Sequence, residues 1–199
     1  MKKVVRPLYN IFLDLKRSFK LSLLQVKNNN LTIGSNTIID YKTKIYSFNN
    51  TISIGNNVYL RSNDKYYQAG MPFSTTLLTD VKGSFIKIGD NCRINGVYIH
   101  AQKGITIGAN CVIASGVNIM DSNGHQLKSY DRTSGRDEPS EIVIGNNVWI
   151  GLNAIILKGT IIGNNAVIGA GSVVKGEYPA NSLIMGNPAK LVKQINMEQ

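Results

Sequence analysis

Two histidines, His100 and His125, are the side chains of this sequence best suited to move protons at neutral pH. Imidazole has an unperturbed pKa of about 6.5, so it can accept and return a proton in the physiological range. His125 ends the polar stretch Asp121-Ser-Asn-Gly-His, where a regular pattern in the preceding sequence stops. His100 lies in Val97-Tyr-Ile-His-Ala and is expected to be structural, partly buried and hydrogen-bonded. His125 is therefore either a group that transfers protons or a surface-loop histidine without a catalytic role.

The number and positions of the histidines and cysteines disfavour both metal and thiol chemistry. A zinc site takes three or four protein ligands, and two histidines without a Cys/His cluster do not supply such a set. Cys92 and Cys111 each follow a periodic aliphatic residue by four positions, as do other small residues of the chain. We expect both cysteines to be structural, with no disulfide, no covalent thiol intermediate and no metal.

The elements that position these groups have an unusual period. An aliphatic residue returns at every sixth position near the C-terminal end: Ile144, Ile150, Ile156, Ile162, Ile168 and Val174. Neither a helix nor an isolated strand has this period, so each six-residue unit is interpreted as a short strand followed by a corner. Three units then complete one triangular turn of a coil.

Small residues and asparagine or glycine occupy the expected corners. The small residues are Val148, Ala154, Thr160, Ala166 and Ser172, and the corner residues are Asn146, Asn147, Gly159, Asn164, Asn165 and Gly171. Asparagine and glycine tolerate the left-handed backbone conformation that a tight corner needs. The sequence therefore predicts an all-β fold.

Three phrases resemble a known family. They are Ile144-Gly-Asn-Asn-Val-Trp149-Ile-Gly, Val167-Ile-Gly-Ala-Gly-Ser-Val-Val174 and Gly186-Asn-Pro-Ala-Lys190. Together and in this order they resemble the hexapeptide-repeat acetyltransferases of the galactoside and maltose O-acetyltransferase branch. The resemblance implies a left-handed parallel β-helix, a homotrimer and acetyl-CoA as co-substrate. The resemblance alone gives the handedness.

The resemblance also implies roles for individual residues. A histidine at the position of His125 is the general base in those enzymes, and an asparagine at the position of Asn95 orients the acceptor or the acetyl group. A structural corner role is the alternative for Asn95. The His125 ring needs an orienting acceptor; Asp121, Glu138, Glu141 or a backbone carbonyl could serve, and we select Asp121.

A donor groove between subunits is the further implication of the resemblance. Small residues let the pantetheine arm approach the backbone, an aromatic residue lines the groove, and lysines meet the nucleotide phosphates. The matching positions are Trp149, Gly151, Leu152, Gly169, Ala170, Lys175, Lys190 and Lys193. A capping role for Trp149 and a solvated tail for the lysines are the alternatives. Lys175-Gly176 stands where the family often has Thr-Lys, so the phosphate contacts differ in detail.

The N-terminal residues have a different pattern. Apolar residues from Val4 to Val26 recur at helical spacing, with lysines and arginines on the opposite face. Residues 2–27 are therefore predicted to form a basic amphipathic helix. Its apolar face either packs on the β-helix or a neighbouring subunit, or lies on an anionic membrane surface.

The predicted organisation has three parts. Residues 1–28 form the N-terminal helical arm, residues 29–180 form the β-helix domain, and residues 181–199 form a C-terminal tail with a short helix. Within the β-helix, residues 121–141 are rich in polar and charged side chains and are expected to be an external loop. Residues 61–84 leave the repeat as well, and either shape the acceptor pocket or fill a subunit interface.

Composition limits the function classes. The net charge of +10 admits a nucleic acid, an anionic membrane or coenzyme A as a partner, but no nucleic-acid motif occurs. No apolar run is long enough to span a bilayer, which favours the cytoplasm, with peripheral contact at the inner face of the membrane through the arm. We expect an O-acetyltransferase acting on a sugar hydroxyl of a bacterial surface polysaccharide or its precursor. The alternatives are a streptogramin- or chloramphenicol-type antibiotic acetyltransferase and a non-catalytic trimeric scaffold.

Overall fold

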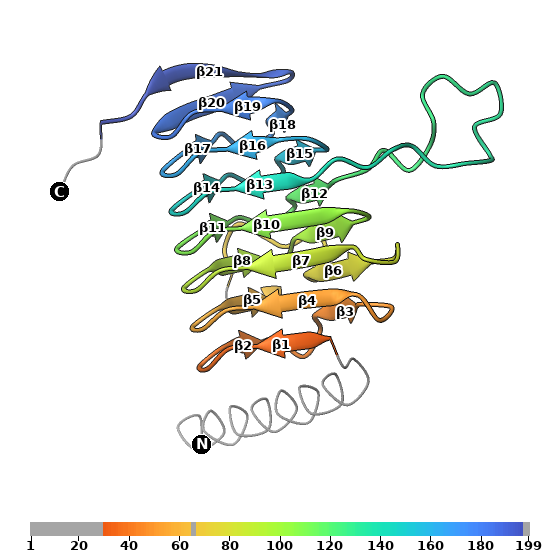
Figure 1. Cartoon of the computed structure of the whole chain (residues 1–199). Coiled ribbons are helices and arrows are strands. Elements are labelled where there is room, and N and C mark those ends of the chain that lie inside the picture. Colours follow the sequence, from red (N-terminus) through yellow and green to blue (C-terminus); the bar gives the residue numbers. More distant parts are fainter. Residues whose placement is uncertain (1–29, 65–66, 197–199) are drawn as a thin grey trace, which may run out of the picture.

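The computed structural model describes residues 30–64 and 67–196, and its regular elements in these ranges are β-strands (Figure 1). The helix predicted over residues 2–27 lies outside the described residues. The strands stack along one axis and form three sheets that run along this axis. Every pairing of strands is parallel except that between the last two strands.

The first sheet has seven strands: β1 (Leu31–Ile33), β4 (Thr51–Ile54), β7 (Phe85–Ile88), β10 (Gly104–Ile107), β13 (Ile142–Ile144), β16 (Ile161–Ile162) and β19 (Glu177–Tyr178). The second has eight: β2 (Ile38–Ile39), β5 (Tyr59–Arg61), β8 (Arg93–Asn95), β11 (Val112–Ile113), β14 (Trp149–Ile150), β17 (Val167–Ile168), β20 (Ser182–Gly186) and β21 (Ala189–Gln194). The third has six: β3 (Lys44–Tyr46), β6 (Thr76–Thr79), β9 (Tyr98–Ala101), β12 (Asn118–Met120), β15 (Ile155–Leu157) and β18 (Val173–Val174).

From β1 to β20, successive strands along the chain belong to successive sheets, and neighbours within a sheet are three strands apart. The last strand, β21, instead pairs with β20 in the same sheet. Three strands therefore complete one coil, and each coil stacks on the one before it. This arrangement is a parallel β-helix, as the six-residue period predicts.

The core is a set of aliphatic stacks that follow the strand register. In the second sheet, Ile94 pairs with Ile113, Ile113 with Ile150 and Ile150 with Ile168, and all four are buried. All six periodic aliphatics from Ile144 to Val174 are buried as well. Each such side chain contributes about 1.5–3 kcal/mol through burial. The period of six is thus the period of the core.

The corners carry asparagines in the left-handed conformation. Asn147 and Asn165 have φ values of 56° and 60°, and the side-chain amide of Asn147 donates to Asn165 Oδ1 at 3.0 Å. A β-carbon added to the neighbouring Gly145 would lie 2.6 Å from Asn164 Oδ1, so this position needs glycine because adjacent coils approach closely. The corner prediction is confirmed at Asn147 and Asn165, whereas Asn164 uses its side chain to accept the backbone N–H of Asn146.

The cysteines occupy the same corners. Cys92 and Cys111 are free and fully buried, and their sulfur atoms lie 3.1 Å from Gly108 O and 3.2 Å from Gly145 O. Their structural interpretation is confirmed.

The C-terminal helix prediction is wrong. Residues 189–194 form β21, which pairs antiparallel with β20, and β20 extends the second sheet beside β17. The open edge of the sheet offers hydrogen-bond partners to the backbone of this segment, whereas a short isolated helix is marginal in water. Tertiary context therefore decides the secondary structure here.

Residues 121–141 contain no strand and project to one side of the stack between β12 and β13 (Figure 1). We call this segment the external loop.

Candidate active site

The external loop leaves the β-helix at Asp121, whose side chain is fully buried. Its carboxylate accepts the backbone N–H groups of Gln102 at 2.7 Å, Lys103 at 2.8 Å and Gly104 at 2.7 Å. Both oxygens are used in joining the start of the loop to the coil before it. These hydrogen bonds give Asp121 a structural role in the backbone, and its orientation of His125 stays a prediction.

Asp137 fixes the segment that carries His125. Its carboxylate accepts the hydroxyl of Ser122 at 2.6 Å and the backbone N–H groups of Asn123 at 2.9 Å and Gly124 at 3.1 Å. It also forms an ion pair with Lys158 at 2.6 Å, and its side chain is only 6% exposed. Burial opposes the charge, but these hydrogen bonds and the lysine lower the pKa of Asp137 to about 2.

A second ion pair joins the loop to an earlier coil. Arg136 donates to Asp80 Oδ2 at 3.1 Å, and the other Asp80 oxygen lies 2.9 Å from His100 Nε2. Burial alone would raise the pKa of Asp80, but its interactions with His100 and Arg136 hold this pKa below its ordinary value. Residues 136 and 137 therefore connect the loop to two different coils.

The Arg136–Asp80 ion pair borders an open pocket of about 450 Å³. It is lined by Asp80, His100, Gln102, Gly124, His125, Thr133, Gly135 and Arg136. The His125 side chain is exposed within it. A solvent-accessible imidazole beside a fixed carboxylate and a guanidinium can take a proton from a bound hydroxyl group and return it to a leaving group.

His100 has the hydrogen-bonded ring expected of it, but it also faces the pocket of His125. No sequence pattern pointed to Asp80, Arg136, Asp137 or Lys158, because these residues lie outside the repeat or pair across more than twenty positions.

Asn95 lies apart from this pocket. It ends β8 in the second sheet, is 9% exposed, and donates through Nδ2 to Ile113 O at 3.0 Å. Within this chain it lines no part of the pocket described for His125. The observed hydrogen bond matches the structural alternative for Asn95.

The positions matched to the donor groove gather on the second sheet. Trp149 on β14 is 55% exposed and pairs with Val167 on β17. A β-carbon on Gly151 would lie 2.7 Å from Ala170 N, so the turns after the two strands are in contact. Leu152 is partly exposed beside them, whereas Gly169 faces the Met185 side chain.

Two of the three lysines lie in this sheet. Lys190 and Lys193 are exposed on β21, where they pair with Met185 and Leu183. Lys175 is exposed after β18, at a corner of the third sheet. Trp149, Lys190 and Lys193 thus share a sheet, and Lys175 does not.

Within residues 30–64 and 67–196, no three His, Cys, Asp or Glu side chains are grouped so as to hold a metal ion. In the same ranges no helix is long and apolar enough to cross a bilayer.

Two family profiles match the repeats. Residues 141–176 match the profile described as bacterial transferase hexapeptide (six repeats), and residues 86–120 match the hexapeptide repeat of succinyl-transferase.

Two of the curated relatives are proteins of Escherichia coli K12. WbbJ, named as an O-acetyl transferase of lipopolysaccharide biosynthesis, is 43% identical over 122 residues, which cover 57% of this chain and 62% of WbbJ. Galactoside O-acetyltransferase is 40% identical over 115 residues, 57% of this chain and 56% of the relative. The chain therefore spans about three fifths of the length of these relatives.

Solved structures share the fold. A galactoside acetyltransferase in complex with coenzyme A has a TM-score of 0.56 and 26% identity, covering 92% of this chain and 82% of its own. AntD, an N-acyltransferase from Bacillus cereus, has a TM-score of 0.65 at 20% identity, covering 88% of each chain.

Proposed function

We propose that this hexapeptide-repeat protein, which is similar to O-acetyltransferases, transfers an acetyl group from acetyl-CoA to a sugar hydroxyl group. The observation that carries the proposal is the setting of His125, an exposed imidazole in a pocket held by the Asp137–Lys158 and Arg136–Asp80 ion pairs. The similarity to WbbJ and to galactoside O-acetyltransferase supports a sugar acceptor. A bacterial surface polysaccharide or its precursor is the acceptor class that we assign.

The mechanism is direct transfer. His125 removes the proton of the acceptor hydroxyl group, and the oxygen attacks the acetyl carbonyl carbon of acetyl-CoA. Backbone N–H groups stabilise the negative charge on the carbonyl oxygen, and the C–S bond then breaks. His125 returns its proton to the coenzyme A thiolate, so no acetyl-enzyme forms.

Acetyl-CoA is placed along the second sheet. Trp149, Gly151, Leu152, Gly169 and Ala170 are assigned to the pantetheine arm, and Lys175, Lys190 and Lys193 to the phosphates. The stacking of β14 on β17 and the exposed lysines of β21 support this assignment. We keep Asn95 as a residue that orients the acceptor or the acetyl group, because it lies on the second sheet, as do most positions assigned to acetyl-CoA.

The similarity to acetyltransferases also leads to a proposal for the oligomeric state and the cellular location of the protein. We infer a homotrimer of left-handed β-helices in the cytoplasm, with an N-terminal arm that ends at residue 28. Residues 2–27 either pack on the β-helix or a neighbouring subunit, or make peripheral contact with an anionic membrane. The similarity to the hexapeptide-repeat acetyltransferases supports the trimer and the handedness.

Acetyl-CoA binding tests the function. Calorimetry on the full chain and on His125→Ala should give about micromolar binding with one site per chain in both, because the histidine moves a proton and adds little donor affinity. Coenzyme A release with sugar acceptors should be lost in the variant alone. If neither protein binds acetyl-CoA, the proposal fails and a non-catalytic scaffold takes its place.

A further inference from the structure

The outer face of the third sheet presents a row of mixed side chains. Lys44 pairs with Thr76, Thr76 with Tyr98 and Tyr98 with Asn118, so these residues stack along successive coils. Their sequence neighbours Ile45, Leu77, Ile99 and Ile119 are buried, and side chains alternate between the two faces of a strand. The row therefore points outward.

This row forms one wall of a hollow of about 400 Å³, here called the third-sheet groove. The groove is lined by Lys44, Tyr46, Phe73, Ser74, Thr76, Leu78, Tyr98 and Asn118. Tyr46 is 47% exposed and Phe73 is 37% exposed, although both are large aromatic residues. Aromatic faces thus stand beside hydroxyl and amide groups along the same surface.

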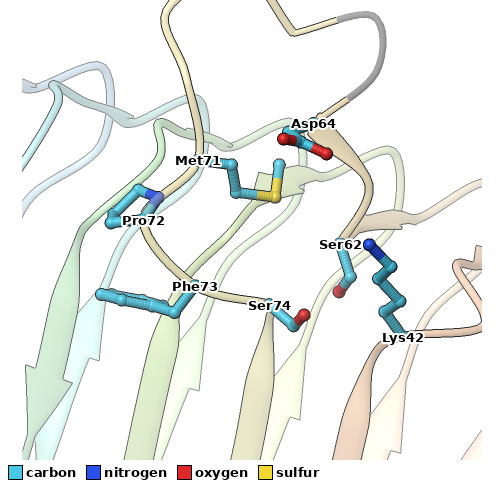
Figure 2. A pocket seen from close by; sticks show the side chains of 7 residues that line it. All are labelled: Lys42, Ser62, Asp64, Met71, Pro72, Phe73 and Ser74. Carbon is cyan, nitrogen blue, oxygen red and sulfur yellow. The ribbon is translucent and has the colours of Figure 1, made fainter.

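At one end the groove continues into a second hollow of about 200 Å³, with which it shares Phe73 and Ser74. Figure 2 shows Lys42 and Ser62 on one side of this hollow and Pro72 and Phe73 on the other. The segment that forms the wall is held against the coils, since Ser115 Oγ donates to Gly70 O at 2.7 Å.

At the other end the groove reaches the candidate active site. The rings of Tyr98 and His100 meet edge to face with their centroids 6.0 Å apart, and His100 lines the pocket of His125. Leu78 of the groove is two residues before Asp80 of that pocket. Across the strands, at right angles to this connection, the row from Lys44 on β3 to Asn118 on β12 crosses three strand spacings, roughly 14 Å. This length exceeds a single sugar ring.

We propose that the third-sheet groove binds a glycan chain of several linked sugars and delivers one of its hydroxyl groups to His125. The inference rests on the proposed function and names its acceptor class. Sugar rings offer apolar faces to Tyr46, Phe73 and Tyr98, and their hydroxyl groups pair with Thr76 and Asn118. Within the chain, Thr76 Oγ1 donates to Ser74 O at 3.3 Å and Asn118 Nδ2 donates to Gly116 O at 2.9 Å. An apolar ligand would still cover the acceptor oxygens of both side chains, which is costly on binding.

Chain length tests the groove. Hexamers of α-1,4-glucose, β-1,4-N-acetylglucosamine and β-1,4-galactose are compared, each beside its monosaccharide, on the full chain with acetyl-CoA. Affinity is measured by saturation-transfer NMR and turnover by coenzyme A release. We expect at least one hexamer to bind about tenfold more tightly than its own monosaccharide, because several rings make contact at once.

Aromatic variants locate the binding surface. Tyr46→Ala and Tyr98→Ala should each weaken binding of that hexamer roughly fivefold, since each removes one stacking face. Tyr46 is already half exposed, so its removal leaves the core intact. Tyr59→Ala is the matched control, because Tyr59 lies outward on the second sheet beneath the Arg61 guanidinium.

The outcomes separate the two proposals. If no hexamer binds more tightly than its monosaccharide, or if Tyr59→Ala weakens binding equally, the groove is overturned even when a monosaccharide is acetylated. If a hexamer binds as expected but no acceptor releases coenzyme A, the groove stands and the proposed function fails. If Tyr46→Ala changes the sedimentation mass and not the hexamer affinity, the face is an interface between copies of this chain and the inference is wrong.

Discussion

Replacing Asp137 with asparagine should loosen the segment that carries His125 without unfolding the β-helix. The carboxylate accepts one hydroxyl and two backbone N–H groups from residues 122–124, and it pairs with Lys158 from another coil. Asparagine keeps the size of the side chain but removes the charge and one of the two acceptor oxygens. The β-helix core does not include this residue, so the effect should stay in the external loop.

The magnitude follows from the pKa. The carboxyl group of Asp137 has its pKa lowered from 3.8 to about 2, so the folded loop favours the charged form. One pKa unit corresponds to about 1.4 kcal/mol, so the shift from 3.8 to about 2 favours the charged carboxylate in the folded loop by roughly 2.4 kcal/mol. The Lys158 side chain is 20% exposed, and solvent screening reduces the expected loss to about 1–2 kcal/mol. Amide exchange at Asn123 and Gly124 should then be roughly 5- to 30-fold faster.

Hydrogen exchange measured by NMR or mass spectrometry on residues 122–126 reads this effect directly. Asp131→Asn is the matched control, because Asp131 lies in the same loop and makes its hydrogen bonds to Thr133 only two positions away. Under the proposed function, Asp137→Asn should also lower the rate of acetyl transfer more than it changes acetyl-CoA affinity. Unchanged exchange in Asp137→Asn, or equal acceleration in the control, would refute the assigned role of Asp137.

The remaining predictions concern pH, packing and thiol access. Because the pKa of Asp137 is depressed, its stabilisation is complete above about pH 4 and is lost as the pH falls towards 2. The protection factors of the loop amides, which are exchange rates corrected for the intrinsic effect of pH, should therefore fall only in that window. Ile162→Ala should cost about 2–5 kcal/mol, because this side chain is 1% exposed, and chemical denaturation measures the loss. Ile161→Ala, at a side chain 42% exposed, should cost clearly less, and equal losses would contradict the assignment of inward and outward faces. Cys92 and Cys111 should react with a thiol reagent only at the rate of unfolding, and fast reaction in native buffer would contradict their burial.

Several features of the fold were accessible from the sequence because they repeat. The aliphatic period predicted the buried stacks, and the small residue four positions later predicted Cys92 and Cys111 as corner residues. The expected C-terminal helix was wrong, because residues 189–194 have no repeat and form a strand only where an open sheet edge is available. The three backbone N–H groups that donate to Asp121 could not be predicted either, because no sequence pattern marks them.

The candidate site was predicted only in part. The exposed position of His125 in a polar loop could be inferred from the end of the repeat. Its surroundings could not, since Asp80 and Arg136 are 56 positions apart and Asp137 and Lys158 are 21 apart. Separations of this kind depend on where irregular segments interrupt the coils.

The sequence by itself determined the period, the inward and outward faces of the strands and the asparagine corners of this protein. These properties are local, because each six-residue unit meets the same steric requirements as the units above and below it. Only the tertiary structure decided which charged groups enclose His125 and which aromatic residues form the third-sheet groove. The external loop has no repeat to set its position, so its ion pairs depend on which coils lie beside it. The third-sheet groove depends on the stacking of residues that are distant in the chain.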